Sequence, residues 1–281
     1  MTGPPEAEAP FSVRFWGARG SMPTPSTHNA RIGGNTTCVQ IKSSQFDDEL
    51  IILDGGSGIH ALGREVMRRA QPPRHIHVFF THFHWDHIQG MPFFEPLYSP
   101  RHHITLYSAH DPGVLQAVLT GQMLPPYFPV PWNEVAAHFA YKQIGAAPVE
   151  CAGLEISAFP LHHPQGSVGF NIQHPRRKVI FATDHEHGEA ATDRNLRQVA
   201  RDADLLIYDA QFTPEEYETG RKGWGHSTWR EGVSVVRDAG ARQLALCHHD
   251  PDREDDAVDN IVERTRGEFA NAVAAAEGVE L

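Results

Sequence analysis

The stretch FFTHFHWDHIQG, residues 79–90, places four potential metal ligands within six positions, directly after an apolar run. These ligands are His82, His84, Asp86 and His87. In an extended segment His82 and His84 point to the same side, and a tight turn can bring Asp86 and His87 toward a second point nearby. Imidazole and carboxylate groups are the ligands that zinc and related divalent ions prefer. The stretch therefore predicts a metal site at the end of a strand.

Four further strand ends carry a histidine or an aspartate in the same position. They are FPLHHPQGS with His162 and His163, VIFATDHEH with Asp184, LLIYDAQF with Asp209, and LALCHHDP with His248 and His249. Strand ends in a layered α/β protein converge on one edge, and the loops at that edge carry function. Residues that follow five separate strands can meet there, which predicts two metal ions close to each other.

Short apolar runs alternate with helical patterns along the chain, which indicates a layered α/β fold. Strands are predicted at residues 11–16, 37–41, 50–53, 75–80, 104–107, 154–159, 168–172, 179–182, 205–208 and 243–247. Helices are predicted at residues 58–69, 193–200, 228–238 and 255–275. We expect Ser227 to cap the third of these helices and Gly240 to end it.

The chain shows no internal repeat and no low-complexity linker. Residues 1–10 are acidic and rich in proline, and they are predicted to form a disordered tail before a single domain at residues 11–281. Residues 111–141 combine a short helical pattern with a stretch rich in proline and aromatic residues. Two interpretations stay open for this insert: a surface excursion, or a lid in which Tyr127 and Phe128 form part of a substrate pocket.

Composition limits the partners of the protein. The 281 residues include 35 acidic side chains against 24 Lys and Arg, a formal net charge of −11. Proteins that bind long nucleic acids nonspecifically normally have the opposite charge, so no such partner is expected. Three scattered cysteines do not form a disulfide framework, and the sequence has neither a signal-peptide pattern nor a membrane-spanning apolar run. These features predict a cytoplasmic protein that does not associate with membranes.

The motif THFHWDH matches the HxHxDH signature, and in this respect the chain resembles the metallo-β-lactamase fold family. The resemblance continues in chain order through Asp54 in ILDGGSG, His163, Asp184 and His248, and it covers residues 11 to about 265. It implies an αββα sandwich with a dinuclear metal site at one edge of the two sheets. FWGARGSMPTP, GGNTTC and GWGHST resemble the ribonuclease Z-like and phosphodiesterase-like branch. GGSG and HHDP resemble a bacterial subgroup described as cyclic-nucleotide phosphodiesterase-like.

The resemblance implies a ligand set for two divalent ions. The ligands of the first ion are His82, His84 and His163, those of the second are Asp86, His87 and His248, and Asp184 bridges the two. At the two histidine pairs, His162 and His249 remain as alternatives to His163 and His248. Zinc is the expected metal, with manganese and iron as alternatives.

Other residues are expected to support the chemistry. Asp54 and Asp209 resemble carboxylates that orient the ligand histidines from behind. A hydroxide that bridges the two ions would attack phosphorus, and Asp86 would orient it. His226, in GWGHST, would protonate the departing oxygen or hold a phosphoryl oxygen.

These expectations favour an enzyme that hydrolyses a small phosphodiester, with 3′,5′-cyclic nucleotides as the leading candidates. One alternative is a ribonuclease Z-type tRNA 3′-processing endonuclease, and another is a lactonase or thioesterase that uses the same metals. A binding protein on an inactive scaffold is disfavoured because every ligand position is filled. A homodimer is compatible with the sequence.

Overall fold

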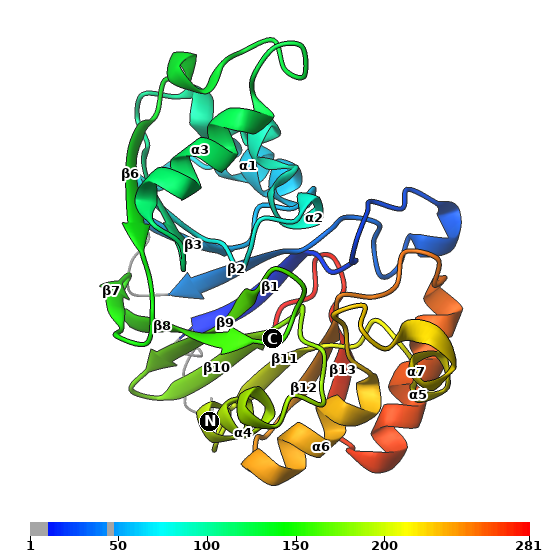
Figure 1. The fold of residues 1–281 in the computed structure, drawn as a ribbon. Helices are drawn as coiled ribbons and strands as arrows, with labels where there is room; N and C mark the ends of the chain where they lie inside the picture. The colour runs from blue at the N-terminus through cyan, green and yellow to red at the C-terminus, as the bar shows by residue number, and fades with distance from the viewer. Residues whose placement is uncertain (1–10, 44–47) are drawn as a thin grey trace, which may run out of the picture.

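The architecture is a sandwich of two β-sheets covered by helices on both outer faces (Figure 1). A computed structural model describes residues 11–43 and 48–281, so the tail expected at residues 1–10 lies outside the described residues. The layers confirm the predicted αββα fold class. None of the helices in the described part of the chain combines the length and apolarity needed to cross a membrane.

The first sheet has its six strands in chain order. They are β1 (Phe11–Gly17), β2 (Cys38–Ser43), β3 (Glu49–Leu53), β4 (His75–Phe79), β5 (His103–Ser108) and β6 (His138–Gln143). The strands from β3 to β6 run parallel, and the connecting segments therefore cross the outer face of the sheet. These segments hold α1 (Ile59–Arg68), α2 (Trp85–Ile88), α3 (Pro112–Gln122) and short 3-10 turns at Met91–Phe93, Glu95–Tyr98 and Trp132–Glu134. A further 3-10 turn, Thr27–Asn29, lies between β1 and β2.

The second sheet has seven strands in the order β13, β12, β11, β10, β9, β8, β7. Their bounds are β7 (Val149–Cys151), β8 (Leu154–Leu161), β9 (Ser167–His174), β10 (Arg177–Ala182), β11 (Leu205–Asp209), β12 (Leu244–Cys247) and β13 (Ala272–Ala274). The outer face is covered by α4 (Ala190–Val199), α6 (Trp229–Ala239) and α7 (Asp255–Glu268). The short α5 (Pro214–Glu216) and a π-helical turn at Tyr217–Arg221 lie between β11 and α6.

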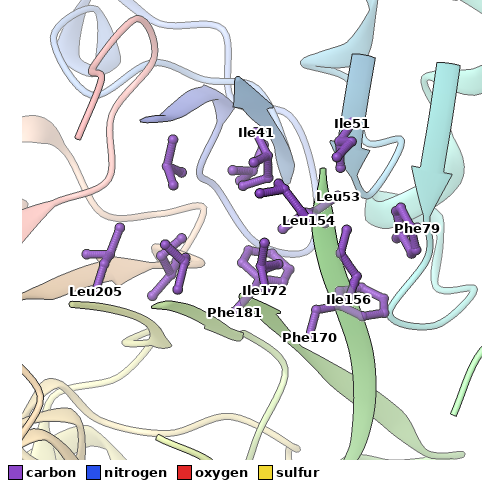
Figure 2. Close-up of a cluster of buried hydrophobic side chains, with 14 of the residues drawn as sticks. Ile41, Ile51, Leu53, Phe79, Leu154, Ile156, Phe170, Ile172, Phe181 and Leu205 are labelled. Carbon is purple, nitrogen blue, oxygen red and sulfur yellow. The ribbon is translucent and has the colours of Figure 1, made fainter. Parts of the chain in front are cut away.

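The main core lies between the two sheets. Strand β1 shows how the sequence builds it, because Phe11, Val13 and Phe15 are buried on one side while the residues between them are half-exposed. Figure 2 shows the facing side chains, with Ile41, Ile51, Leu53 and Phe79 from the first sheet and Leu154, Ile156, Phe170, Ile172, Phe181 and Leu205 from the second. Each fully buried side chain of this size contributes about 1.5–3 kcal/mol.

Two expectations about secondary structure were wrong. The helix predicted at residues 255–275 ends at Glu268, and Ala272–Ala274 instead forms strand β13, which pairs in parallel with β12. The alanine-rich sequence favours a helix, but Phe269 has extended backbone angles and the open edge of β12 provides a hydrogen-bonding partner. The cap of α6 is Thr228, whose hydroxyl accepts from the Glu231 amide, and not Ser227. Gly240 ends this helix in a left-handed conformation, as predicted.

Candidate metal centre

The site is built where strands of both sheets end. The segment with His82 and His84 follows β4 of the first sheet, and α2 presents Asp86 and His87. The second sheet contributes His163 after β8, Asp184 after β10, Asp209 at the end of β11 and His248 after β12. His226 lies in the loop before α6. The convergence of strand ends expected from the sequence therefore brings these residues into one buried cluster.

Four overlapping groups of potential ligand atoms lie in the cluster; two of them include His226, and the remaining two share no residue. One group comprises His82, His84 and His163, and within it the atoms that can bind an ion lie within 4.8 Å of one another. The other comprises Asp86, His87, Asp184 and His248, with the same limit on distance. These are the two ligand sets that the resemblance implies, apart from Asp184, which was expected to serve both.

Asp184 faces both groups. Its Oδ2 lies 3.2 Å from Nε2 of His87, and its Oδ1 lies 3.2 Å from Nε2 of His248. The same Oδ1 lies 3.9 Å from Nε2 of His82 and 3.8 Å from Nε2 of His163. A single carboxylate is thus positioned between the two sets of imidazoles, where a bridging ligand would have to lie.

Each of the five imidazoles has one ring nitrogen held from outside the cluster. In the second group, His87 Nδ1 donates to Asp54 at 2.9 Å and His248 Nδ1 donates to Gln211 at 2.9 Å. In the first group, His163 Nδ1 donates to the Gly225 carbonyl at 2.7 Å and His82 Nδ1 donates to Thr81 Oγ1 at 3.0 Å. His84 is held through Nε2, which donates to Gln165 at 2.9 Å. In every case the other nitrogen faces the cluster, where a cation can bind it. Outside partners of this kind fix the tautomer and orientation of metal-bound histidines.

The inward-facing atoms fit divalent cations. Nε2 of His82 and Nε2 of His87 are buried and make no hydrogen bond to any described residue. His84 Nδ1 and His163 Nε2 lie 3.1 Å apart, and two acceptors at that distance repel each other unless a cation or proton binds both. Burial disfavours a charged His248, yet Asp184 and Asp86 raise its pKa to about 9. The site therefore favours positive charge, and its imidazole and carboxylate donors are those of zinc and similar ions.

Two aspartates lie behind the ligands. Asp54 is fully buried, bonds to His87 and accepts from the Thr81 amide at 2.8 Å. Asp209 accepts from His226 Nδ1 at 2.8 Å and from the Asp184 amide at 3.0 Å. Both carboxylates thus orient residues of the cluster from outside it, in the positions expected from the sequence.

Three residues of the cluster region adopt a left-handed backbone. Asp54, Asp184 and His248 have φ angles of 61°, 59° and 58°. Such a conformation costs about 1–3 kcal/mol for a residue other than glycine, and it persists where the surrounding structure enforces it. All three residues stand where a strand has just ended, so the left-handed backbone turns the chain at the edge of the sheet that carries the cluster.

The structure separates the two ambiguous histidine pairs. His162 is exposed and bonds through Nδ1 to the Glu186 carbonyl at 3.0 Å, whereas His163 belongs to the cluster. His249 donates from Nε2 to the Ala275 carbonyl at 3.0 Å, and burial lowers its pKa to about 3. His163 and His248 therefore lie in the cluster, and their chain neighbours face away from it.

Several supporting residues were not singled out from the sequence. Gln211 and Gly225 hold His248 and His163, as described above. Glu186 accepts from the amides of Gly223 and Gly225 and from the Tyr217 hydroxyl, and so it fixes the loop that carries His226. Gln211 stands two positions after Asp209, and Gly225 lies in the motif GWGHST. Neither sequence pattern reveals that these residues bond to His248 and His163.

A hollow of about 400 Å³ opens beside the cluster. The residues that line it are Ser21, Phe83, His84, Trp85, Asp86, Asp184 and His226. The pocket residues predicted from the sequence, Tyr127 and Phe128, are not among them. Tyr127 is 80% exposed, and Phe128 packs edge-on against Phe93 at 5.5 Å, beside the apolar cluster under the helices of the first sheet. The structure therefore does not bring these two side chains to the cluster.

The sequence matches a known family and named relatives. Residues 50–249 match the sequence profile of the family described as "Beta-lactamase superfamily domain". A protein named ribonuclease Z from Haloarcula marismortui is 26% identical, covering 94% of each chain, and one from Haloferax volcanii is 28% identical over 72% of this chain and 76% of its own.

Solved structures share the fold. The metallo-beta-lactamase fold protein YhfI from Bacillus subtilis superposes with a TM-score of 0.71 at 18% identity, covering 96% of this chain and 98% of its own. A diphosphatase from the PhnP family gives 0.68 at 18% identity, with 96% and 97% covered. The short form of human tRNase Z gives 0.67 at 19% identity, with 96% and 98% covered.

Proposed function

Because the chain belongs to the β-lactamase superfamily and is a metallohydrolase of that fold, we propose that it hydrolyses small phosphodiesters with two divalent ions. The observation that carries the proposal is the position of Asp184 between the two groups of ligand atoms. Two ions held by one bridging carboxylate form the arrangement that stabilises both the attacking and the departing oxygen in a displacement at phosphorus.

The two groups of ligand atoms would hold one ion each. His82, His84 and His163 would bind the first ion, Asp86, His87 and His248 the second, and Asp184 both. When bound, the ions lower the pKa of water and neutralise the charge of phosphoryl oxygens. Zinc is the metal we propose, with manganese and iron as alternatives.

The other side chains of the hollow have roles that follow from their contacts. His226 lines the hollow, and its Nδ1–H donates to Asp209, so its Nε2 is the nitrogen available to the substrate. A protonated Nε2 would give its proton to the departing oxygen, a contribution of about 10²–10⁴ in rate. Asp86 also lines the hollow, and Oδ2 accepts from the Ser21 amide at 2.8 Å, so its carboxylate is held in place to orient the attacking water.

A second candidate is cleavage of tRNA precursors, because both relatives described above carry the name ribonuclease Z. Two observations weigh against it. The net charge of −11 opposes binding of a polyanion, and the described residues that line the hollow include no lysine or arginine. We therefore propose a compact diester, with 3′,5′-cyclic nucleotides as the leading candidates.

The test compares kcat/KM for cyclic AMP and cyclic GMP with that for a tRNA precursor carrying a 3′ trailer, at two salt concentrations. The proposal expects hydrolysis of a cyclic nucleotide that changes little with salt, and slow or no trailer removal. Efficient trailer removal that weakens steeply with salt would make the protein a processing nuclease instead. A panel of lactones and thioesters in the same assay tests attack at carbonyl carbon.

A further inference from the structure

Trp85 is an exposed tryptophan inside the ligand motif itself. It lies between His84 and Asp86, begins α2, and leaves 67% of its surface open to solvent. Tryptophan is highly buried on average, so a solvent-open tryptophan in the lining of a hollow has apolar surface free to contact a ligand. Its chain neighbours His84 and Asp86 belong to the cluster, and all three residues line the hollow.

The other strongly exposed tryptophan provides a contrast. Trp224 is 54% exposed, but the Arg221 guanidinium lies 4.3 Å from the centre of its ring. Trp224 is also not among the residues that line the hollow. The ring of Trp224 therefore already has a partner within the chain, the Arg221 guanidinium. Trp224 can serve as a control for Trp85.

Phe83 adds a fixed aromatic surface to the same hollow. Its ring lies 5.2 Å from that of His110 and 6.3 Å from that of Phe80, and it packs at the edge of the apolar cluster under the first sheet's helices. The hollow thus has an aromatic part, formed by Phe83 and Trp85, and a polar part that includes Asp86, Asp184 and His226.

The charges in the hollow restrict what can occupy it. The described residues that line it carry carboxylates and imidazoles but no lysine or arginine. Bound ions would therefore be the cations available to a phosphate, and no lining side chain is positioned to neutralise a second one. A volume of about 400 Å³ lies near the lower end of the range of small-molecule pockets, about 300–1,000 Å³.

We infer that Trp85 and Phe83 form a subsite for an uncharged planar ring of the substrate, such as a nucleobase. Aromatic side chains stack on any base because every base has a π-face, and this contact needs no charge. The inference rests on the proposed function for the phosphate side of the hollow, and it adds the chemical class of the group attached to that phosphate.

The first test measures binding and needs no turnover. Adenosine 5′-monophosphate and ribose 5-phosphate carry the same phosphate and differ by the base, and each is titrated calorimetrically into the metal-loaded protein. We expect the nucleotide to bind about tenfold more tightly. Trp85→Ala should remove that preference, and Trp85→Phe should keep most of it. Trp224→Ala is the matched control, because any effect there should fall equally on both probes.

The second test measures hydrolysis of cyclic AMP and of the base-free 1-deoxyribose 3′,5′-cyclic phosphate. Trp85→Ala should raise KM for cyclic AMP about tenfold and leave KM for the base-free diester unchanged. Equal or unmeasurable binding of both probes by the wild-type protein, or a base preference that survives in Trp85→Ala, overturns the subsite. If neither diester is hydrolysed but the base preference depends on Trp85, the proposed function fails and the subsite stands.

Discussion

His162 and His163 are neighbours in the chain whose side chains meet different surroundings. His163 faces the cluster and is held by the Gly225 carbonyl, whereas His162 is exposed and bonds to the Glu186 carbonyl. His163→Ala should therefore lower the metal content of the purified protein and reduce activity by several orders of magnitude. His162→Ala, the matched control, should keep its metal. Elemental analysis of the two variants decides, and loss of metal only in His162→Ala would reverse the assignment.

His226 should act on the reaction without holding an ion. Its Nδ1 is bonded to Asp209, and its ring stacks on that of His248 at 4.7 Å, so the side chain is fixed at the wall of the hollow. His226→Ala should retain metal and lower kcat by about 10²–10⁴ on a diester with a poor leaving group. On bis(p-nitrophenyl) phosphate, whose leaving group needs no proton, the loss should be much smaller. An equal loss on both diesters would indicate stabilisation of phosphoryl charge instead.

Single residues show how far the sequence could predict this site. The residues of the two candidate ligand groups were identifiable because each follows a strand or stands in a compact motif, and strand ends meet at one edge. Gln211 and Glu186 were not, because their roles depend on loops from distant segments that meet only in the folded chain. Tyr127 and Phe128 lie in a segment rich in proline and aromatic residues, which is typical of a pocket wall. The residue types alone do not show which face of the molecule the segment occupies.

Among the structural elements, the loop before α6 is held in place by one side chain, that of Glu186. Glu186 accepts from the amides of Gly223 and Gly225, and the Gly225 carbonyl in turn accepts from His163. Glu186→Ala should free this loop, lower kcat by at least tenfold and lower the melting temperature by a few degrees, because the buried Gly225 amide and the partly buried Gly223 amide lose their acceptor.

The matched control for Glu186 lies three residues along the chain. Glu189 accepts from the amides of Ala191 and Thr192 at the start of α4, on the exposed surface. Glu189→Ala should lower the melting temperature slightly, as loss of a helix cap does, with kcat unchanged. Thermal melts and kinetics on both variants test the difference, and an equal effect on kcat would contradict the role given to Glu186.

Elements with a strong periodic pattern were predictable, and those defined by their neighbours were not. Each of the strands expected from the sequence is present, with bounds that shift by a few residues. Strand β6 was missed because it lies at the edge of the sheet and buries none of its side chains fully, so its sequence lacks a buried apolar run. Strand β13 was assigned to a helix because alanine favours helices, and only its pairing with β12 makes it a strand.

At the scale of the whole molecule, the candidate metal centre draws its residues from both sheets. His82, His84, Asp86 and His87 follow strand β4 of the first sheet, whereas His163, Asp184 and His248 follow strands of the second. Each of the two ligand groups thus takes residues from both sheets. An ion bound by either group would therefore link the two halves of the sandwich and bind the folded chain far better than the unfolded one.

This linkage predicts that metal removal destabilises the entire protein. A ligand that binds only the folded state contributes about 2.7 kcal/mol per site at a free concentration of about 100 Kd. For a chain of this length that contribution corresponds to about 5 °C in the melting temperature for each site. We expect a shift of this size between metal-loaded protein and protein treated with a chelator and dialysed. In Asp184→Ala, which loses the carboxylate between the groups, the chelator should change the melting temperature little. If the wild-type protein melts at the same temperature with and without its metal, the ions do not join the sheets, and the cluster is stable without them.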